Sequence, residues 1–516
     1  MKKSKTGGVL ILDFGSQYTQ LIARRVREKN VYSEIYPPNT SLKSILSKNP
    51  KAIILSGGPA SVFSDDAPNF DKEILNINIP ILGICYGLQL LVHHNGGTVD
   101  STGEGEYGFA TIKTVTKNGI VKNMSSSSKV WMSHMDHVTI VPDDWEVVAY
   151  SSNNIVAAIA SNDHMRFATQ FHPEVSHTEE GEILLNNFLF HISGCEKNWT
   201  AGNFVKEQIE SLKNKIGNNR ILVGVSGGVD STVVASLINE AVGSKCFAVI
   251  IDHGLLRKDE ARDCVSALKQ GLGMNIHLYD ESEVFFSRLR GVKDPEQKRK
   301  IIGDQFIQSF DRIATKIGKF KFLGQGTLYP DIIESGVSKG KSAHVIKSHH
   351  NVGGLPDEMN FDLIEPLKDL FKDEVRKVGN KLNISDELVK RHPFPGPGLG
   401  VRIIGEITKE RVSILQEADE IFINVLKEEN EYDNIWQAFA VLIPVKTVGV
   451  MGDRRTYENL IALRAVTSLD GMTADWYRMP SELLSKISNK IVNNVSGVNR
   501  VVYDITSKPP GTIEWE

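Results

Sequence analysis

The stretch PILGICYGLQLLV, residues 80–92, places a cysteine between glycines at the point where one apolar run ends and another begins. The spacing predicts a short buried strand over residues 81–84, followed by a helix with apolar residues every three or four positions. Gly83 and Gly87 permit a sharp turn and a close approach of the two elements. Cys85 would then lie at a strand-to-helix turn, the arrangement of a nucleophile elbow, where the helix N-terminus favours the thiolate.

The alternative role for Cys85 is structural, because free cysteines are among the most buried residues and many of them fill cores. A nucleophilic cysteine needs a base, and TQFHPEVSHT, residues 169–178, offers His172 and Glu174 with only a proline between them. On a strand, or on a loop stiffened by that proline, the two side chains can converge. Glu174 would then orient the imidazole while His172 takes the thiol proton.

Donors for an oxyanion are offered by LSGGPAS, residues 55–61, where two glycines follow an apolar run. The backbone N–H groups of Gly57 and Gly58, with that of Tyr86 at the head of the predicted helix, could stabilise developing negative charge. Taken alone, the glycine pair would be interpreted as a simple turn. Taken alone, His172, one of 14 histidines, would more often be a surface residue than a catalytic base. Their occurrence in the same predicted α/β unit as the cysteine favours acyl-transfer chemistry.

Length and composition limit the other classes of function. The chain has 516 residues, which suggests three or four domains, and its net charge of −4 gives no basic field that would favour nucleic acid. No apolar run is long enough to span a membrane or to act as a signal peptide. The four cysteines show neither a CxxC spacing nor a disulfide framework. We therefore expect a cytoplasmic protein with no membrane or nucleic-acid partner.

The order of the apolar runs predicts an α/β fold. In the first 190 residues, runs such as GVLILDFGS and KAIILSGGP end in Gly/Ser loops and alternate with helical stretches, which is typical of a parallel sheet. A linker candidate follows at 192–202, and a second α/β unit begins at RILVGVSGGVDSTVV. HPFPGPGLG, residues 392–400, can be neither helix nor central strand, so we expect a boundary or an ordered loop there.

The second α/β unit begins with a candidate phosphate loop. In LVGVSGGVDSTVV, residues 222–234, an apolar strand runs into a glycine- and hydroxyl-rich turn before a helix. Such turns present backbone N–H groups and a helix N-terminus to an anion, and Asp230 could hold Mg²⁺. The lysine of a Walker A loop is missing. Further along, Asp331 and Glu334 share one face of a predicted helical turn and could steer the metal or the phosphates, although an exposed acidic turn is an equal alternative.

Two sets of motifs resemble known families. GICYGLQ, SGGP and FHPEVSHT are similar to those of class I glutamine amidotransferases, and SGGVDS is similar to the pyrophosphate loop of N-type ATP pyrophosphatases. The first resemblance implies Cys85 as nucleophile, His172 as base and Glu174 as its orienter. It also implies an oxyanion and glutamine site at Gly57, Gly58, Tyr86 and Gln89. The second implies an ATP site at Ser226, Gly227, Gly228, Val229, Asp230, Ser231, Thr232, Ile251 and Gly326, with metal ligands Asp230, Asp331 and Glu334.

A third resemblance covers essentially the whole chain. The two motifs occur in the order found in the glutamine-hydrolysing GMP synthetase family, and four further stretches also resemble that family: DPEQKRKIIGD, IKSHHNVGGLP, HPFPGPGLGVRI and the C-terminal NRVVYDITSKPPGTIEWE. The resemblance implies a flavodoxin-like parallel-sheet amidotransferase domain (1–197), a doubly wound parallel-sheet ATP pyrophosphatase domain (198–396) and an α+β dimerisation domain (397–516). The implied substrates are glutamine, ATP with Mg²⁺, and xanthosine monophosphate (XMP), with no prosthetic group, in a homodimer.

The resemblance implies that the acceptor site lies mainly in the C-terminal region. The residues that it implies for XMP binding are Arg299, Gln437, Arg500, Lys508, Ile513 and Glu514, and Lys298 is a further candidate. A loop-rich span, 335–356, is a candidate lid. Three residues depart from the family pattern: Met135 and Arg454 stand where glycine is usual, and His253 where asparagine is frequent.

Two alternatives belong to other classes. An RNA-thiolating enzyme with the same loop would need a basic surface and a working cysteine near the loop, which the net charge and the lack of a CxxC disfavour. A nucleotide-binding regulator with inactive sites would not need every triad and loop residue, yet all are present.

Overall fold

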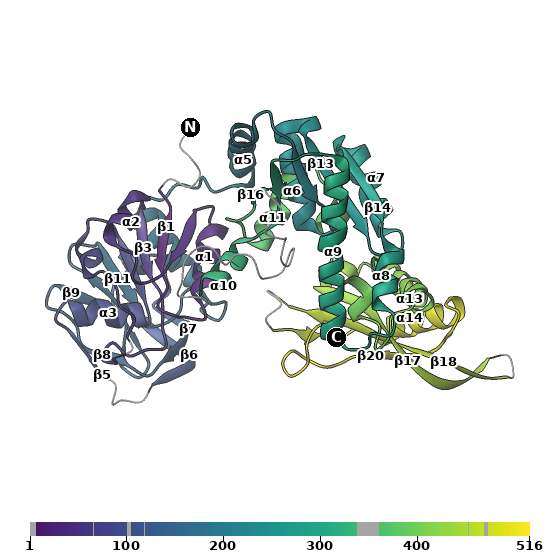
Figure 1. Cartoon of the computed structure of the whole chain (residues 1–516). Coiled ribbons are helices and arrows are strands. Elements are labelled where there is room, and N and C mark those ends of the chain that lie inside the picture. Colours follow the sequence, from purple (N-terminus) through teal and green to yellow (C-terminus); the bar gives the residue numbers. More distant parts are fainter. Residues whose placement is uncertain are drawn as a thin grey trace. The chain divides into compact units, whose positions relative to one another are not determined.

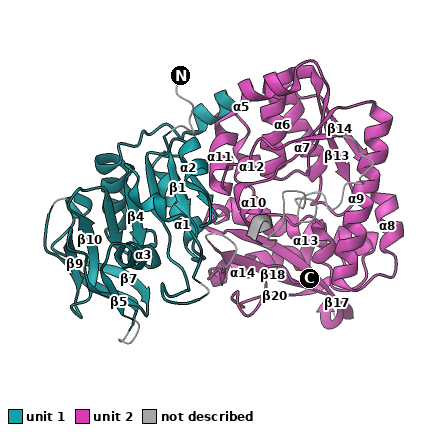
Figure 2. Cartoon of the chain, turned by 60° about the vertical axis from the view of Figure 1, so that its left-hand side comes forward, with its two compact units in different colours: residues 1–207 teal, residues 208–516 magenta. Residues whose placement is uncertain are grey.

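The computed structural model describes residues 7–65, 67–100, 105–117, 119–337, 361–451, 454–468 and 473–516. It divides the chain into two compact units, residues 1–207 and 208–516 (Figure 2). The motif IKSHHNVGGLP and most of the candidate lid lie outside the described residues. No helix in the described part of the chain is long and apolar enough to cross a membrane.

The first unit is built on a nine-stranded sheet with the order β2-β1-β3-β4-β11-β10-β9-β6-β7. Helix α3 and strands β1, β3 and β11 of this unit are labelled in Figure 1. The strands from β2 to β11 pair in parallel, and their order of 2-1-3-4-5 is that of flavodoxin-like sheets. Its strands are β1 (Val9–Leu12), β2 (Ser33–Tyr36), β3 (Ala52–Leu55), β4 (Ile81–Ile84), β6 (Glu106–Thr114), β7 (Ser127–His134), β9 (Trp145–Ser151), β10 (Val156–Ser161) and β11 (Arg166–Thr169), and β5 (Thr98–Asp100) pairs separately with β8 (His137–Ile140).

The parallel and antiparallel halves of this sheet have different sequences because they are covered differently. Strands β1, β3, β4 and β11 are buried along their whole length, and the first three of them consist only of Ile, Leu, Val, Ala or Gly. Strand β6, in the antiparallel half, exposes much of one face. The helices of this unit are α1 (Thr19–Glu28), α2 (Leu42–Ser47), η1 (Lys72–Asn76), α3 (Tyr86–His94), η2 (Gly119–Val121), α4 (Gly181–Asn186) and the π-helix η3 (Asn187–Ile192).

The second unit contains a five-stranded, fully parallel sheet with the order β14-β13-β12-β15-β16, which is 3-2-1-4-5 in chain order. Helices cover both of its faces. Val223 and Gly324 are paired neighbours on one face, where a Cβ on Gly324 would meet Ile238 of α6. Gly224 points to the other face, where a Cβ would meet Phe310 of α9. The sheet is therefore doubly wound, as predicted.

The same unit holds a second, four-stranded sheet, in which the long antiparallel strands β17 and β18 are joined by β19 and β20. Helix α13 packs on β17 and α14 packs on β20. Strands of this unit are β12 (Ile221–Gly224), β13 (Cys246–Asp252), β14 (Ile276–Asp280), β15 (Phe322–Gly324), β16 (Asp362–Ile364), β17 (Gln437–Met451), β18 (Arg454–Thr467), β19 (Asp475–Trp476) and β20 (Val498–Tyr503).

The helices from the unit junction onward complete the fold. They are α5 (Ala201–Ile216), α6 (Val229–Val242), η4 (Gly243–Lys245), α7 (Glu260–Leu272), α8 (Ser282–Leu289), α9 (Pro295–Ile317), α10 (Tyr329–Val337), α11 (Lys372–Lys381), α12 (Asp386–Val389), η5 (Gly398–Val401), α13 (Lys409–Glu428), η6 (Tyr432–Asn434) and α14 (Ser481–Asn494). The predicted loop at 392–400 is irregular up to residue 397, and its last residues enter η5, since a short 3₁₀ turn tolerates the glycines there.

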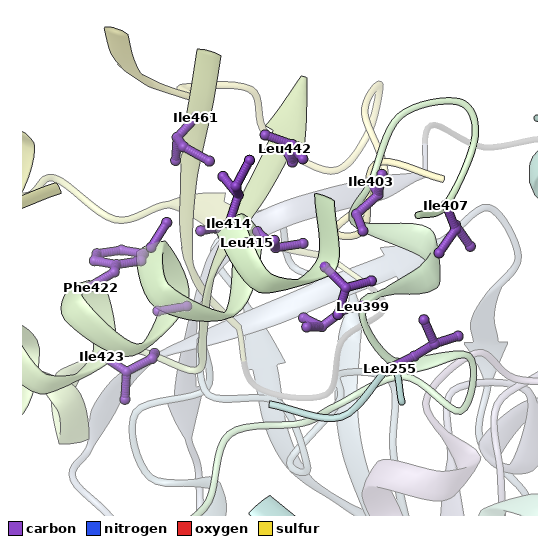
Figure 3. Close-up of a cluster of buried hydrophobic side chains, with 14 of the residues drawn as sticks. Leu255, Leu399, Ile403, Ile407, Ile414, Leu415, Phe422, Ile423, Leu442 and Ile461 are labelled. Carbon is purple, nitrogen blue, oxygen red and sulfur yellow. The ribbon is translucent and has the colours of Figure 1, made fainter. Parts of the chain in front are cut away.

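One hydrophobic core joins the two sheets of the second unit. Leu255, beyond β13, and Leu399, in the proline-rich loop, belong to the same buried cluster as Leu415 and Phe422 of α13 and Leu442 of β17 (Figure 3). The predicted domain limits of 1–197, 198–396 and 397–516 stay predictions.

Candidate active site

Cys85 occupies the turn between β4 and α3. Its backbone angles, φ 53° and ψ −103°, lie where residues other than glycine are rarely found, and such strain is concentrated at functional sites. The glycines make the tight turn possible, because a Cβ on Gly83 would lie 2.5 Å from the carbonyl oxygen of Gly87. The Cys85 N–H donates to the carbonyl oxygen of Thr169 at 2.7 Å, which ties the elbow to β11.

His172 and Glu174 meet on the loop that follows β11. His172 Nδ1 lies 2.7 Å from Glu174 Oε1, and both side chains are buried. The imidazole and the cysteine both border Gly57: a Cβ there would lie 3.2 Å from His172 Cε1 and 3.6 Å from Cys85 Cβ. The structure thus brings the predicted nucleophile, base and orienter into one buried site.

The charge of His172 follows from its neighbours. Burial lowers its pKa, but the charge of Glu174 and hydrogen bonding to Cys85 and Glu174 outweigh burial and raise the pKa to about 10. The imidazole therefore holds its proton at neutral pH. An imidazolium beside the sulfur is the partner that stabilises a thiolate, the form of cysteine that attacks a carbonyl carbon.

The glycine pair after β3 lies beside the same site. Ser56 Oγ accepts the Phe14 N–H at 2.9 Å, and a Cβ on Gly58 would lie 2.6 Å from the carbonyl oxygen of Phe14, so this loop packs directly on the segment after β1. Among the described residues, the N–H groups of Gly57 and Gly58 have no hydrogen-bond acceptor. Tyr86 begins α3, so its N–H belongs to the first turn of that helix. These donors are suited to an oxyanion.

Gln89 connects the elbow helix to the loop after β7. Its Nε2 donates to the carbonyl oxygen of Asp136 at 2.9 Å, and Cys85 Sγ lies 3.6 Å from the carbonyl oxygen of Ser133. Met135, which departs from the family pattern, is 61% exposed and has a negative φ. The conformational freedom of glycine is therefore not needed at this position.

The buried pair of His134 and Glu106 supports the loop after β7. His134 Nδ1 lies 3.1 Å from the carbonyl oxygen of Asp136, and His134 Nε2 lies 3.3 Å from Glu106 Oε2. Glu106 Oε1 accepts hydrogen bonds from Ser151 Oγ and Asn153 Nδ2, each at 2.8 Å. Sequence reasoning missed the pair because its members lie on different strands and belong to no local motif.

Two more groups at the cysteine site were not predicted. The Tyr18 ring lies 5.0 Å from the His172 ring, and Gln170 Nε2 lies 3.8 Å from Cys85 Sγ. Gln170 could have been found, because residues two apart in extended chain point to the same side and Gln170 lies two before His172. No signal in the sequence marks Tyr18.

The second predicted site lies at the carboxyl end of β12. Gly227 has a φ of 78°. The Ser226 N–H donates to Ser231 Oγ at 3.1 Å, and that hydroxyl donates to the carbonyl oxygen of Gly228 at 3.1 Å, which closes the loop on the first turn of α6. A left-handed residue followed by a helix N-terminus directs backbone N–H groups toward an anion. The strand order reverses between β12 and β15, where ligands of doubly wound sheets bind.

Asp230 faces the same position. A Cβ on Gly326, just beyond β15, would lie 3.4 Å from Asp230 Cβ, so the two loops meet. Asp230 Oδ2 pairs with Lys372 Nζ at 2.5 Å, whereas Oδ1 is buried without a hydrogen-bond partner among the described residues. Val229, Thr232 and Ile251 have buried side chains. Any contact that these three make with ATP would therefore involve the backbone or the Thr232 hydroxyl.

The other predicted metal ligands are placed differently. Asp331 Oδ2 accepts the Leu328 N–H at 2.8 Å, which caps α10. Glu334 lies in α10, but its side chain is outside what the structure describes. In the described ranges, no three acidic, histidine or cysteine side chains gather as a metal cluster. Asp230 is thus the candidate with an oxygen available, which suits Mg²⁺ because that ion commonly uses one or two carboxylates together with phosphate oxygens.

The C-terminal tail brings three of the predicted acceptor residues together. Glu514 accepts hydrogen bonds from Gln437 Nε2 at 2.7 Å and from Arg402 Nε and Nη2 at 3.0 and 2.8 Å. Arg299 donates to the carbonyl oxygen of Glu516, and Lys298 donates to its side chain. These buried or half-buried bonds order the tail. Arg402, which is fully buried, was not predicted from the sequence.

The remaining acceptor candidates are placed elsewhere in the unit. Ile513 is buried in a cluster with Phe439 and Val466. Arg500 is exposed on β20 and donates to the carbonyl oxygen of Val448 at 3.4 Å. The backbone of Lys508 pairs with Ala474. Their roles toward XMP stay predictions. His253 is buried, which lowers its pKa to about 4, and its Nδ1 accepts the Leu255 N–H at 3.1 Å.

Comparison with known proteins agrees with this arrangement. Residues 10–192 match the glutamine amidotransferase class-I family, residues 201–303 the NAD synthase family, and residues 424–515 the GMP synthase C terminal domain. The chain is 52% identical to GMP synthase (glutamine-hydrolyzing) of Fusobacterium nucleatum, over 99% of this chain and 100% of the relative. It is 53% identical to the protein of the same name from Thermosipho africanus, over 98% of this chain and 99% of the relative. The chain therefore belongs to the glutamine-hydrolysing GMP synthase family.

Proposed function

We propose that the protein converts XMP to GMP, with glutamine as the nitrogen donor and ATP as the activating substrate. The observation that carries the proposal is the buried Cys85–His172–Glu174 assembly in the same chain as a phosphate loop at a strand-order reversal. The first site fits amide hydrolysis and the second fits binding of a nucleoside triphosphate. Together with the family membership, the two sites support the reaction that we propose, in which XMP, ATP, glutamine and water give GMP, AMP, pyrophosphate and glutamate.

Release of ammonia would begin with attack of the Cys85 thiolate on the amide carbon of glutamine. The negative charge that forms on the amide oxygen would be stabilised by the N–H groups of Gly57, Gly58 and Tyr86. Protonated His172 would give its proton to the leaving ammonia, forming a thioester with Cys85. The neutral imidazole would then take a proton from water, which attacks the thioester and releases glutamate.

Activation of the acceptor would take place at the Ser226–Thr232 loop. The loop N–H groups and the α6 N-terminus would bind the phosphates of ATP, and Asp230 Oδ1 would hold Mg²⁺, which offsets phosphate charge when bound. XMP O2 attacks the α-phosphorus and pyrophosphate leaves. Ammonia then attacks C2 of the adenylated XMP, and AMP departs with O2.

The acceptor would bind near Gln437 and Glu514, which are hydrogen-bonded to each other beside β17. Arg299, Arg500, Lys508 and Ile513 are the further candidates. A homodimer through the C-terminal sheet is part of the proposal. Exposed apolar side chains on β17 and β18 support it, because such side chains are costly to leave in water: Val445, Val448, Val450 and Tyr457.

Replacing the nucleophile tests the separation of the two chemistries. Cys85→Ala should abolish GMP formation with glutamine and leave formation with ammonium chloride within about twofold of the wild type, because the ATP loop is untouched. Cys195→Ala, a change at another buried cysteine of the first unit, is the matched control and should retain both activities. Equal loss of both activities in a folded Cys85→Ala protein would contradict the two-site proposal.

A further inference from the structure

A salt-bridged arginine is hydrogen-bonded to the backbone of the phosphate loop. Arg391, in the segment between α12 and the proline-rich loop, donates from Nη1 to the carbonyl oxygen of Gly227 at 2.9 Å. Its Nη2 lies 2.5 Å from Glu260 Oε1, and the Arg391 and Glu260 side chains are 15% and 3% exposed. A Cβ on Gly227 would lie 3.3 Å from Glu260 Oε1, so the pair packs directly against the loop.

The pair continues into a chain of alternating charges. The second oxygen of Glu260, Oε2, accepts the Arg257 N–H at 2.7 Å. Arg257 Nε lies 2.9 Å from Asp419 Oδ2 on α13, and both side chains are largely buried. Burial lowers the pKa of Arg257, but the charges of Asp419 and Glu260 outweigh it and raise the pKa. Two cations and two anions therefore balance in a region that excludes most water.

The chain ends on the strand that carries Gln437. Asp419 Oδ1 accepts the Ala440 N–H at 2.9 Å, and Arg257 Nη2 donates to the carbonyl oxygen of Ala438 at 3.2 Å. Four residues thus connect the Gly227 carbonyl group to β17, with the backbone N–H of Arg257 as the link between Glu260 and Arg257.

The Gly227 carbonyl shares its planar peptide group with the Gly228 N–H, so the direction of the carbonyl fixes the direction of that N–H, which donates to Ser226 Oγ at 3.4 Å. In an anion-binding turn the N–H groups converge on the ligand while the carbonyl groups point away from it. A carbonyl oxygen turned toward the phosphates would repel them. The charged hydrogen bond from the partly buried Arg391 to the Gly227 carbonyl oxygen fixes the orientation of this peptide group.

We propose that Arg391 and Glu260 are positioning residues for ATP, and that Arg257 and Asp419 fix this pair to β17. The pair acts through the backbone of Gly227 and need not touch the substrate. This inference rests on the proposed function of the loop as the ATP phosphate site. It predicts that the orientation of the loop, and hence binding of ATP, depends on residues far from the loop in sequence.

The test uses ammonium chloride as nitrogen source, so that the cysteine site is not required, and follows AMP release at varied ATP. Arg391→Lys and Glu260→Gln should each raise KM for ATP about 10- to 100-fold, the effect of losing one charge-assisted hydrogen bond. KM for XMP and glutaminase turnover should stay within about twofold. Arg262→Lys makes the same change at an arginine that is 80% exposed, and should leave KM for ATP unchanged.

A merely structural role would not give the same pattern. Guanidinium ion should restore ATP affinity to Arg391→Ala in part, because the cavity can accept the missing cation. If Arg391→Ala does not fold, Arg391→Lys decides the question. Because Arg391, Glu260, Arg257 and Asp419 form one connected series of charged residues, the two end positions should be coupled. Arg391→Lys and Asp419→Asn together should therefore raise KM for ATP by less than the product of their separate effects.

The outcomes separate this inference from the proposed function. If the wild-type protein releases no AMP with Mg-ATP, XMP and ammonium chloride, the proposed function fails. If the wild-type protein releases AMP but Arg391→Lys and Glu260→Gln keep the wild-type KM for ATP, the positioning role is overturned. An equal rise in the KM values for ATP and XMP, with no rescue by guanidinium, would also overturn it.

Discussion

Replacing Glu174 by glutamine tests how the cysteine site controls its base. The change keeps the size and shape of the side chain but removes the charge that lies 2.7 Å from His172 Nδ1. Burial of His172 lowers its pKa, and Glu174 is the first of the groups that outweigh burial and raise it to about 10. Glu174→Gln removes the largest contribution that raises the pKa of His172, so this pKa should fall and the ion pair with the thiolate should weaken.

The expected effect follows from the two tasks of Glu174. A buried hydrogen bond to a charged group contributes about 1.5–3 kcal/mol, and a correctly protonated, oriented acid–base residue accelerates proton transfer about 10²- to 10⁴-fold. We therefore expect glutamine hydrolysis by Glu174→Gln to fall about 10²- to 10⁴-fold in kcat, while ammonia-dependent GMP formation stays within about twofold.

The assay compares glutamate release from glutamine with AMP release in ammonium chloride, for the wild type, Glu174→Gln and Glu179→Gln. Glu179 is exposed and makes the same charge change on the same loop, so its variant controls for net charge. Glutaminase activity of Glu174→Gln within about tenfold of the wild type would contradict the proposed role of Glu174. Rates of Cys85 alkylation across a pH series provide a second readout, since their pH dependence should change in Glu174→Gln and not in Glu179→Gln.

Three further predictions follow from local geometry. The folded-state pKa of His172, about 10, lies above its unfolded value of 6.5. The charged pair therefore stabilises the fold fully below about pH 6.5, and less as the pH rises through 10. In urea unfolding, His172→Gln should cost more stability near pH 6 than near pH 10.5. Gly83→Ala places a Cβ 2.5 Å from a carbonyl oxygen and should lower the free energy of unfolding by about 1–3 kcal/mol, whereas Gly271→Ala, in open space on α7, should not destabilise in thermal unfolding. Asp230→Asn should reduce AMP release about 10²-fold or more with glutamine and ammonium alike, and unchanged release would remove Asp230 from the metal role.

The features that the sequence predicts well are those encoded locally. Gly83 and Gly87 flank Cys85 within five residues, and the structure shows the sharp turn that this spacing indicates. The parallel strands are short continuous apolar runs because both of their faces are covered, and a run of that kind can be recognised without a partner. His172 and Glu174 are separated by one residue, so their convergence also depends on local chain geometry.

The features that the sequence does not predict depend on long-range packing. Arg391 and Gly227 meet across 164 positions, and nothing near either residue marks the pairing. Ile513 is an apolar residue in a polar tail, but only the fold shows that it fills a core beside Phe439. The expected parallel fold did not include the antiparallel half of the first sheet. Apolar and polar residues alternate along these strands, and such strands can pair with many partners.

The central claim is that one chain couples glutamine hydrolysis to ATP-dependent amination of XMP. Its most direct test is product analysis of the purified protein with Mg-ATP, glutamine and a panel of nucleoside monophosphates. We expect AMP, pyrophosphate, glutamate and GMP to form together, in equal amounts, with XMP alone among the acceptors. Release of AMP with another acceptor and none with XMP would contradict it.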